Sequence, residues 1–248
     1  MNRKRRHPAI NVALKLLYTY RWTIGIYWLV FLCIYVAIGV ILRSPTVGAE
    51  MDAQGIWEGA STSPKVFLLV IGILMTPLSL ASFVSNGVTR RHFIWGVSGL
   101  LVVYSAISAI IMVIGYPIEQ WIYDKYDWPL ELSNPHLFKD ASQFGLIFVE
   151  YFFLFIAFFG SGWLIGSCFY RFNWKLAVVL ILLAILPAMA METVISADWI
   201  GSILQKAYDI ERASLAAVIP LALCIVALVF ASVFLLLRKV PVKRKVLS

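Results

Sequence analysis

The chain has 248 residues, of which 61% are hydrophobic and 14% are charged, and its formal net charge is +8. A water-soluble protein of this length could not bury so much apolar surface, so the excess must face lipid. The basic excess does not indicate a nucleic-acid partner, because the cationic residues flank apolar segments in the pattern of a membrane protein.

The first 21 residues predict a basic cytoplasmic tail followed by an interfacial elbow helix. Asn11, Lys15 and Thr19 fall four residues apart, on one face of a helix that runs from Pro8 to Tyr20. Basic residues flank this helix, which suits the inner surface of a membrane. The apolar run that follows is too long for a signal peptide and has no cleavage site, so we interpret it as a retained signal anchor.

Six apolar segments follow, and each is long enough to predict a membrane-spanning helix. Internal prolines in the second, fifth and sixth segments predict kinks. Apolar residues recur every four positions over residues 192–212, which predicts an amphipathic helix on the outer face before the last span. The expected fold class is an all-α membrane protein with a transmembrane domain over residues 22–237 and a basic tail over 238–248. Its spans are expected at about 22–42, 66–85, 93–116, 144–170, 174–191 and 213–237.

The distribution of charge predicts the orientation of these spans. If both termini are cytoplasmic, 15 of the 21 lysines and arginines lie on the inner side. Of the 13 acidic residues, twelve then lie in outer segments and one lies within a span. This is a strong positive-inside pattern. Short termini and compact loops favour the inner membrane of a bacterium.

A short basic turn joins the second and third spans. Asn86 and Gly87 form a turn signal. Thr89 can cap a helix that begins at Arg90 and Arg91. A positive-inside anchor is the alternative explanation for the two arginines taken alone.

Several common catalytic and nucleotide-binding patterns are absent from the sequence. It contains no P-loop, no H-E-x-x-H and no G-x-S-x-G. His7, His92 and His136 are scattered along the chain, so we expect surface histidines and no metal site. The sequence therefore disfavours an enzyme.

The fourth span contains two features with open interpretations. Glu150 is the one ionisable residue within a predicted span, and either a structural bond to a neighbouring helix or a cargo or gating role would explain it. Gly160, Gly162 and Gly166 let another helix approach closely, either within the bundle or at a subunit interface.

Two motifs resemble bacterial ABC exporter permeases of the second type (ABC-2). The segment Phe83-Val-Ser-Asn-Gly-Val-Thr-Arg-Arg-His-Phe93 resembles the family's Gly-Val-Thr-Arg pattern, which is followed by a basic residue and an aromatic after the second span. The segment Gly166-Ser-Cys-Phe-Tyr-Arg-Phe172 is similar to the end of the family's fourth span, although Asn173 stands where a glycine commonly follows. The layout of an elbow helix, six spans and an outer helix also agrees with the family.

The resemblance implies a non-catalytic permease that works as a pair with a second permease, the same or a different chain. Two separate ABC ATP-binding subunits would bind ATP and Mg²⁺, so this chain would carry no cofactor. The bilayer would surround the pair, the cargo would be amphipathic or hydrophobic, and the outer helix would act as a lid. The residues that would contact the ATPase are Asn86, Gly87, Thr89, Arg90, Arg91 and His92, with a contribution from Arg171 and Lys175 in the second short turn.

Two other functions remain open from the sequence. The first is a membrane-embedded enzyme or an immunity-type membrane protein that acts without an ATPase. The second is a channel-like or structural helical bundle. Co-purification of an ATPase would separate the permease from both alternatives, and catalytic turnover by the purified chain alone would support the first.

Overall fold

The computed structural model describes residues 7–42, 55–126, 136–195 and 215–238. Regular secondary structure within these ranges is entirely α-helical, and six helices are long and apolar enough to cross a membrane. This confirms the predicted class of an all-α membrane protein. The helices are α1 (Pro8–Leu42), α2 (Ile56–Ala60), α3 (Thr62–Ser85), α4 (Arg90–Lys125), α5 (Phe144–Arg171), α6 (Trp174–Ile195) and α8 (Leu215–Leu237).

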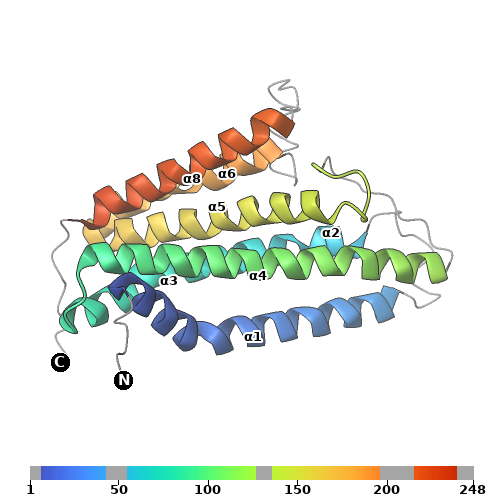
Figure 1. Ribbon diagram of the computed structural model, residues 1–248, viewed down its shortest axis with the longest axis horizontal. Coiled ribbons are helices and arrows are strands. Elements are labelled where there is room, and N and C mark those ends of the chain that lie inside the picture. Colours follow the sequence, from blue (N-terminus) through green and yellow to red (C-terminus); the bar gives the residue numbers. More distant parts are fainter. Residues whose placement is uncertain (1–6, 43–54, 127–135, 196–214, 239–248) are drawn as a thin grey trace.

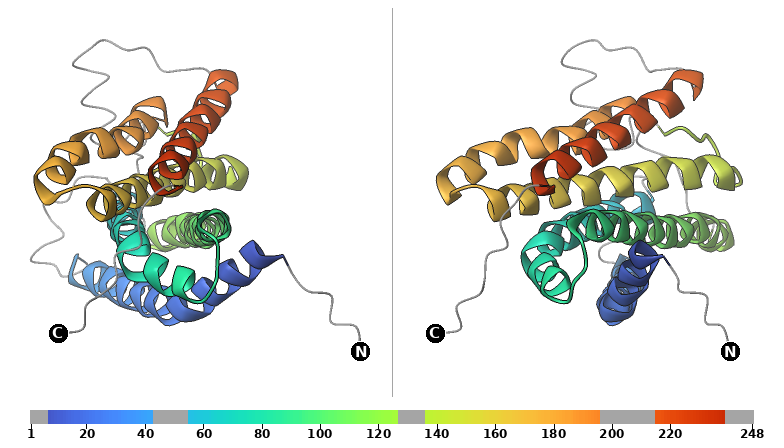
Figure 2. Two further views of the ribbon diagram at one scale, coloured as in Figure 1. Left: turned by 90° about the vertical axis from the view of Figure 1, so that its left-hand side faces the viewer. Right: turned by 60° about the vertical axis from the view of Figure 1, so that its left-hand side comes forward.

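Helix α5 occupies the centre of the bundle and packs against α3, α4, α6 and α8. Helix α1 packs mainly on α4 at one edge, and α6 lies beside α8 at the other edge (Figure 1). Helices α4 and α5 run along the long axis of the molecule, and the rotated views show that α1, α6 and α8 are inclined to them (Figure 2). Large apolar side chains on α1, α6 and α8 are exposed, as expected for helices that border lipid.

The long helices alternate in direction, which gives the bundle two chemically different ends. We call one the basic end: it holds the start of α1, the turn at residues 86–89, the turn at 171–174 and the end of α8. The opposite end, which we call the acidic end, holds α2, the start of α3 and the residues before α5. The start of α1 and the end of α8 lie on the same side of the molecule (Figure 1).

Helices α3 and α5 approach each other through glycines. A Cβ atom added to Gly162 would overlap the carbonyl oxygen of Leu69, and one added to Gly166 would overlap that of Ile73. From the other side, a Cβ on Gly72 would overlap the carbonyl oxygen of Phe159. Small residues therefore bring the two backbones into direct contact. These glycine contacts lie within the bundle, while Gly160 faces Val229 of α8.

The predicted elbow helix and first span form one continuous helix of 35 residues, α1. Figure 1 shows a bend between its first part, drawn in dark blue, and the rest. The predicted outer helix at residues 192–212 falls mostly outside the described residues. Only its first four residues, Glu192–Ile195, are described, and they form the last turn of α6.

Three helices extend further toward the acidic end than the predicted spans. Helix α3 begins at Thr62 instead of residue 66, α4 continues to Lys125 instead of 116, and α6 continues to Ile195 instead of 191. The additional turns contain Lys65, Glu119 and Glu192, which are all buried. Lys65, Glu119 and Glu192 therefore join Glu150 as buried ionisable residues of the long helices, which the sequence did not predict. A hydropathy profile ends a predicted span at the first charged residue, whereas the helix itself continues where that residue has a buried partner.

Candidate functional site

The turn between α3 and α4 has the geometry of a Schellman motif. Gly87 has a φ of 80°, a conformation that glycine adopts without strain. Its backbone N–H donates to the carbonyl of Val84 at 3.0 Å, and the N–H of Val88 donates to that of Phe83 at 3.1 Å. These two bonds satisfy carbonyl groups that the end of α3 leaves free.

Side chains fix the same turn on both sides. The side-chain amide of Asn86 donates to the carbonyl of Ser82 at 2.6 Å. The hydroxyl oxygen of Thr89 accepts from the backbone N–H of His92 at 3.3 Å, which makes Thr89 the N-cap of α4. The predicted turn and the predicted cap are confirmed, and α4 begins at Arg90 as expected.

Positive charge is concentrated in the first turn of α4. Arg90, Arg91 and His92 are its first three residues, and no acidic residue lies among them. Arg91 is exposed, while Arg90 and His92 are half-buried. The N-terminal end of a helix is the positive end of its dipole, so cations there are locally unfavourable. An anionic binding partner would relieve this cost.

The short turn between α5 and α6, which was predicted to contribute to the ATPase contact, has a structural role as well. The guanidinium of Arg171, at the end of α5, donates to the carbonyls of Leu235 and Leu236 at 3.0 and 2.8 Å. These carbonyls belong to the last turn of α8, where a cation is favourable. Lys175 is exposed, with its ammonium 5.9 Å from the ring of Trp174. Arg171 thus ties α8 to α5 at the basic end.

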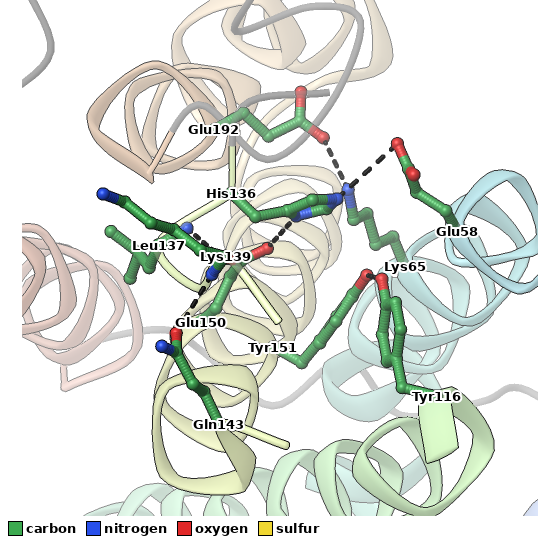
Figure 3. Close-up of polar contacts among 10 residues, drawn as sticks. All are labelled: Glu58, Lys65, Tyr116, His136, Leu137, Lys139, Gln143, Glu150, Tyr151 and Glu192. Carbon is green, nitrogen blue, oxygen red and sulfur yellow. Dashed lines mark hydrogen bonds and ion pairs between the residues drawn. The ribbon is translucent and has the colours of Figure 1, made fainter. Parts of the chain in front are cut away.

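The acidic end contains a cluster of buried ionisable side chains, which we call the buried cluster (Figure 3). None of its members is more than 4% exposed. They come from α2, α3, the segment before α5, α5 itself and α6, so they join five parts of the chain. The members are Glu58, Lys65, His136, Glu150 and Glu192.

His136 lies between two carboxylates. Its Nδ1 is 2.6 Å from Oε1 of Glu150, and its Nε2 is 3.5 Å from Oε1 of Glu58. The second oxygen of Glu150 accepts from the backbone N–H of Leu137 at 2.7 Å. Glu150 therefore holds the segment before α5 against the bundle.

A second ion pair lies in the same cluster. The ammonium of Lys65 is 3.3 Å from Oε1 of Glu192, so the pair joins α3 to α6. Below it, the hydroxyls of Tyr116 and Tyr151 lie 2.6 Å apart and join α4 to α5 (Figure 3). A buried charge is retained only where it is paired and hydrogen-bonded, and both ion pairs meet this condition.

Glu119 forms a neighbouring contact between α4 and α2. Its Oε1 accepts from the backbone N–H of Trp57 at 2.8 Å and from the hydroxyl of Tyr35 at 3.3 Å. The indole N–H of Trp57 in turn donates to the carbonyl of Met112 at 3.1 Å. Glu119 thus anchors α2, which carries Glu58, on the bundle.

His136 is buried, so its predicted place at the surface is wrong. Burial opposes the charged imidazolium, but the carboxylates of Glu150 and Glu58 outweigh burial and raise the pKa of His136 to about 9. His136 is therefore cationic at neutral pH. His7 and His92 lie together at the basic end, with ring centroids 5.3 Å apart. Among the described residues, no group of histidine, cysteine and acidic side chains could hold a metal ion.

Sequence reasoning identified only Glu150 among the members of the buried cluster. Lys65 and Glu192 stand directly beside the predicted ends of two spans, at residues 66 and 191, and were assigned to outer segments. Their ion pair joins positions 127 residues apart, which helical periodicity does not reveal. A usable signal was present: single charges recur beside the same end of several spans, where they can meet.

Comparison with protein-family models, with curated proteins and with solved structures finds no match to this chain.

Proposed function

We propose that the chain is the permease subunit of an ATP-driven exporter and that the turn at residues 86–92 receives mechanical work from a separate ATPase. The observation that carries this proposal is the ordered, cationic turn between α3 and α4. The sequence has no P-loop, so nucleotide energy would have to reach it through a contact. The proposal follows the resemblance to ABC exporter permeases, with the basic end on the cytoplasmic side.

The turn is suited to transmit a displacement because it is fixed to both helices that it joins. Hydrogen bonds from Asn86, Gly87 and Val88 lock it to the end of α3, and Thr89 locks it to the start of α4. A flexible loop would deform when the partner moves, whereas this turn would transmit the displacement to both helices. Arg90 and Arg91 would supply the contacts to an acidic groove of the partner.

The packing of α3 on α5 would carry this displacement across the membrane. The glycine contacts at Gly72, Gly162 and Gly166 leave no side-chain layer that could deform between the two backbones. Lys65 lies 21 positions before Asn86 on α3, which corresponds to about 30 Å along a helix. A shift of α3 at the basic end would therefore reach the buried cluster.

The buried cluster would hold the acidic end closed in the state described here. Its ion pairs join α3 to α6 and α5 to the segment that precedes it. Separation of these elements would break the pairs and admit water, so the cluster supplies two distinct states that a partner can bias. Glu150 then has the gating role that the sequence left open.

A membrane-embedded enzyme is the second candidate, and one observation favours it. His136 between two carboxylates has the arrangement of an oriented acid–base group. In that case, the purified chain would turn over a substrate without an ATPase, and His136→Gln would abolish the turnover. Transport that needs an ATPase and survives His136→Gln would exclude this candidate.

The test of the exporter proposal is co-purification of the full chain from its native membrane in mild detergent. We expect an ABC ATP-binding subunit to accompany the chain, and Arg90→Glu/Arg91→Glu to release it. The matched control is Lys125→Glu/Lys139→Glu, which reverses two exposed basic residues at the acidic end. Loss of the ATPase in the control as well, or retention in the Arg90 and Arg91 variant, would refute the assigned contact.

A further inference from the structure

Two cavities adjoin each other at Trp95, near the basic end. The first has a volume of about 710 Å³ and lies between the start of α1 and the start of α4, with His7, Arg91 and His92 in its wall. The second has a volume of about 360 Å³ and lies between α4, α5 and α8, with Ala227 in its wall. Trp95 lines both cavities.

The first cavity is suited to an anionic group. Arg91 supplies a guanidinium, and the rings of His7 and His92 lie 5.3 Å apart beside it. A guanidinium binds a phosphate through two parallel hydrogen bonds. The remaining wall of this cavity is apolar and includes Ile10 and Leu14, so only one part of it is polar.

The second cavity is suited to an alkyl chain. Two of its polar lining groups already have partners. The hydroxyl of Ser98 donates to the carbonyl of Ile94 at 3.0 Å. The indole N–H of Trp163 likewise donates to Thr76 at 3.0 Å. Nothing in these two side chains calls for a polar ligand. The ring of Trp95 packs on Phe230 of α8, with 4.9 Å between centroids, and both residues line this cavity.

We infer that the two cavities form one binding site for an anionic phospholipid. The phosphate would lie against Arg91 and His92, and one acyl chain would follow the groove past Trp95 toward Ala227. Tryptophan is enriched at the boundary between lipid headgroups and chains, which is the place that Trp95 takes in this arrangement. The inference goes beyond the proposed function and does not depend on the identity of any cargo.

The same site explains the charge in the first turn of α4. Arg91 and His92 face the cavity with Trp95, one turn further along the helix. Anionic lipid there would offset the unfavourable position of the Arg91 guanidinium at a helix N-terminus. Arg91 would then contact both the lipid phosphate and the ATPase, whereas Arg90 would contact the ATPase alone.

Native mass spectrometry of the delipidated full chain tests this inference. The probes are phosphatidylglycerol, phosphatidylcholine with the same acyl chains, and inorganic phosphate. We expect phosphatidylglycerol to bind about tenfold more tightly than phosphatidylcholine, because a net negative headgroup faces Arg91 and His92. Inorganic phosphate should not compete at equal concentration, because it lacks the chain that fills the groove.

Two variants and one control separate the headgroup from the chain. Arg91→Gln should weaken phosphatidylglycerol binding about fivefold and leave phosphatidylcholine unchanged. Ala227→Phe fills the groove from an exposed position on α8 and should weaken binding of both lipids. Lys175→Gln removes an exposed cation at the same end but outside both cavities, and should change neither.

Three results would overturn the inference. Equal binding of the two lipids would show that the headgroup charge is not recognised. Full competition by inorganic phosphate would show that the site binds phosphate alone and not an acyl chain. A dimer that Ala227→Phe dissociates would assign the groove to a second copy of the chain. None of these measurements involves an ATPase, so their failure is distinct from failure of the proposed function.

Discussion

Lys65 and Glu192 form an ion pair that almost no solvent reaches, with side-chain exposures of 1% and 3%. Burial removes the hydration of both charges, and their mutual attraction offsets that loss only while both are present. Such a pair is weak evidence for stability as such, but it is strong evidence that α3 and α6 must stay together in this state. The pair therefore has two states, formed and broken.

Removal of one member of this ion pair should destabilise the protein much more than removal of both. Lys65→Met removes the cation 3.3 Å from the buried carboxylate of Glu192, and we expect a loss of about 3–5 kcal/mol in the free energy of unfolding. Lys65→Met/Glu192→Met should recover a large part of that loss. Thermal unfolding in detergent measures both. A double variant that is as unstable as Lys65→Met would show that the pair is not the main interaction of either residue.

The charge of His136 makes stability depend on pH in a defined direction. Its pKa is about 9 in the folded chain and 6.5 ordinarily, so the folded state favours the protonated form. The contribution is fully present below pH 6.5 and is lost as the pH rises through 9; its size is on the order of 3 kcal/mol.

This dependence can be measured as the unfolding temperature between pH 6 and pH 10. We expect the temperature to fall over the alkaline part of this range in the native chain. His136→Gln should flatten that part of the profile and lower the unfolding temperature at pH 6, because Glu58 and Glu150 lose their cation. A profile that keeps its alkaline slope in His136→Gln would assign the slope to another group.

At the scale of elements, the contact between α3 and α5 depends on two glycines of α5 that replace side-chain packing with backbone packing. Gly162→Ala places a methyl group against the carbonyl oxygen of Leu69, which cannot move without moving α3. We expect a loss of about 1–3 kcal/mol in the free energy of unfolding from this overpacking. The measurement is thermal unfolding of the purified chain.

Gly145 in the same helix provides the matched control. A Cβ atom at Gly145 meets nothing within 4 Å, so Gly145→Ala should be neutral or stabilising by up to about 1 kcal/mol, since alanine favours a helix over glycine. Equal losses in Gly145→Ala and Gly162→Ala would mean that the close approach of α3 contributes nothing measurable.

The sequence predicts the ends of a helix well where an apolar, lipid-facing run sets them. It predicts them less well where buried contacts with other parts of the chain set them. The span of α5 was expected at 144–170 and runs from Phe144 to Arg171, because its apolar run and its ends coincide. Helices α3, α4 and α6 continue past their apolar runs because Lys65, Glu119 and Glu192 find buried partners. The turn at residues 86–89 was predictable because its bonds are local. The pairing within the buried cluster was not predictable, because it depends on the tertiary arrangement, although the charges beside the span ends were a signal that such a cluster could form.

For the whole molecule, α3 connects the two features on which the proposed function depends. It ends at the ordered turn with Asn86 and begins with Lys65 in the buried cluster. Helix α5 accompanies it along the glycine contacts and ends at Arg171, which caps α8. Movement of the basic end relative to α1 would therefore carry α3, α5 and α8 together. Such coupling needs the two ends to face opposite sides of the membrane.

The orientation of these ends can be tested by cysteine labelling in intact cells. In a chain whose Cys33, Cys168 and Cys224 are replaced by alanine, we expect a membrane-impermeant maleimide to label Lys139→Cys from outside. Asn86→Cys should react only after the cells are permeabilised, because the positive-inside distribution places the basic end in the cytoplasm.

Both test positions are exposed in the folded chain, so access depends on the side of the membrane and not on burial. Denaturation in detergent should then label both variants to the same extent, which controls for expression and thiol reactivity. Labelling of Asn86→Cys from outside would place the turn where no cytoplasmic ATPase could reach it. In that event the cations of α4 would still require an anionic partner, but the exporter mechanism would have to be abandoned.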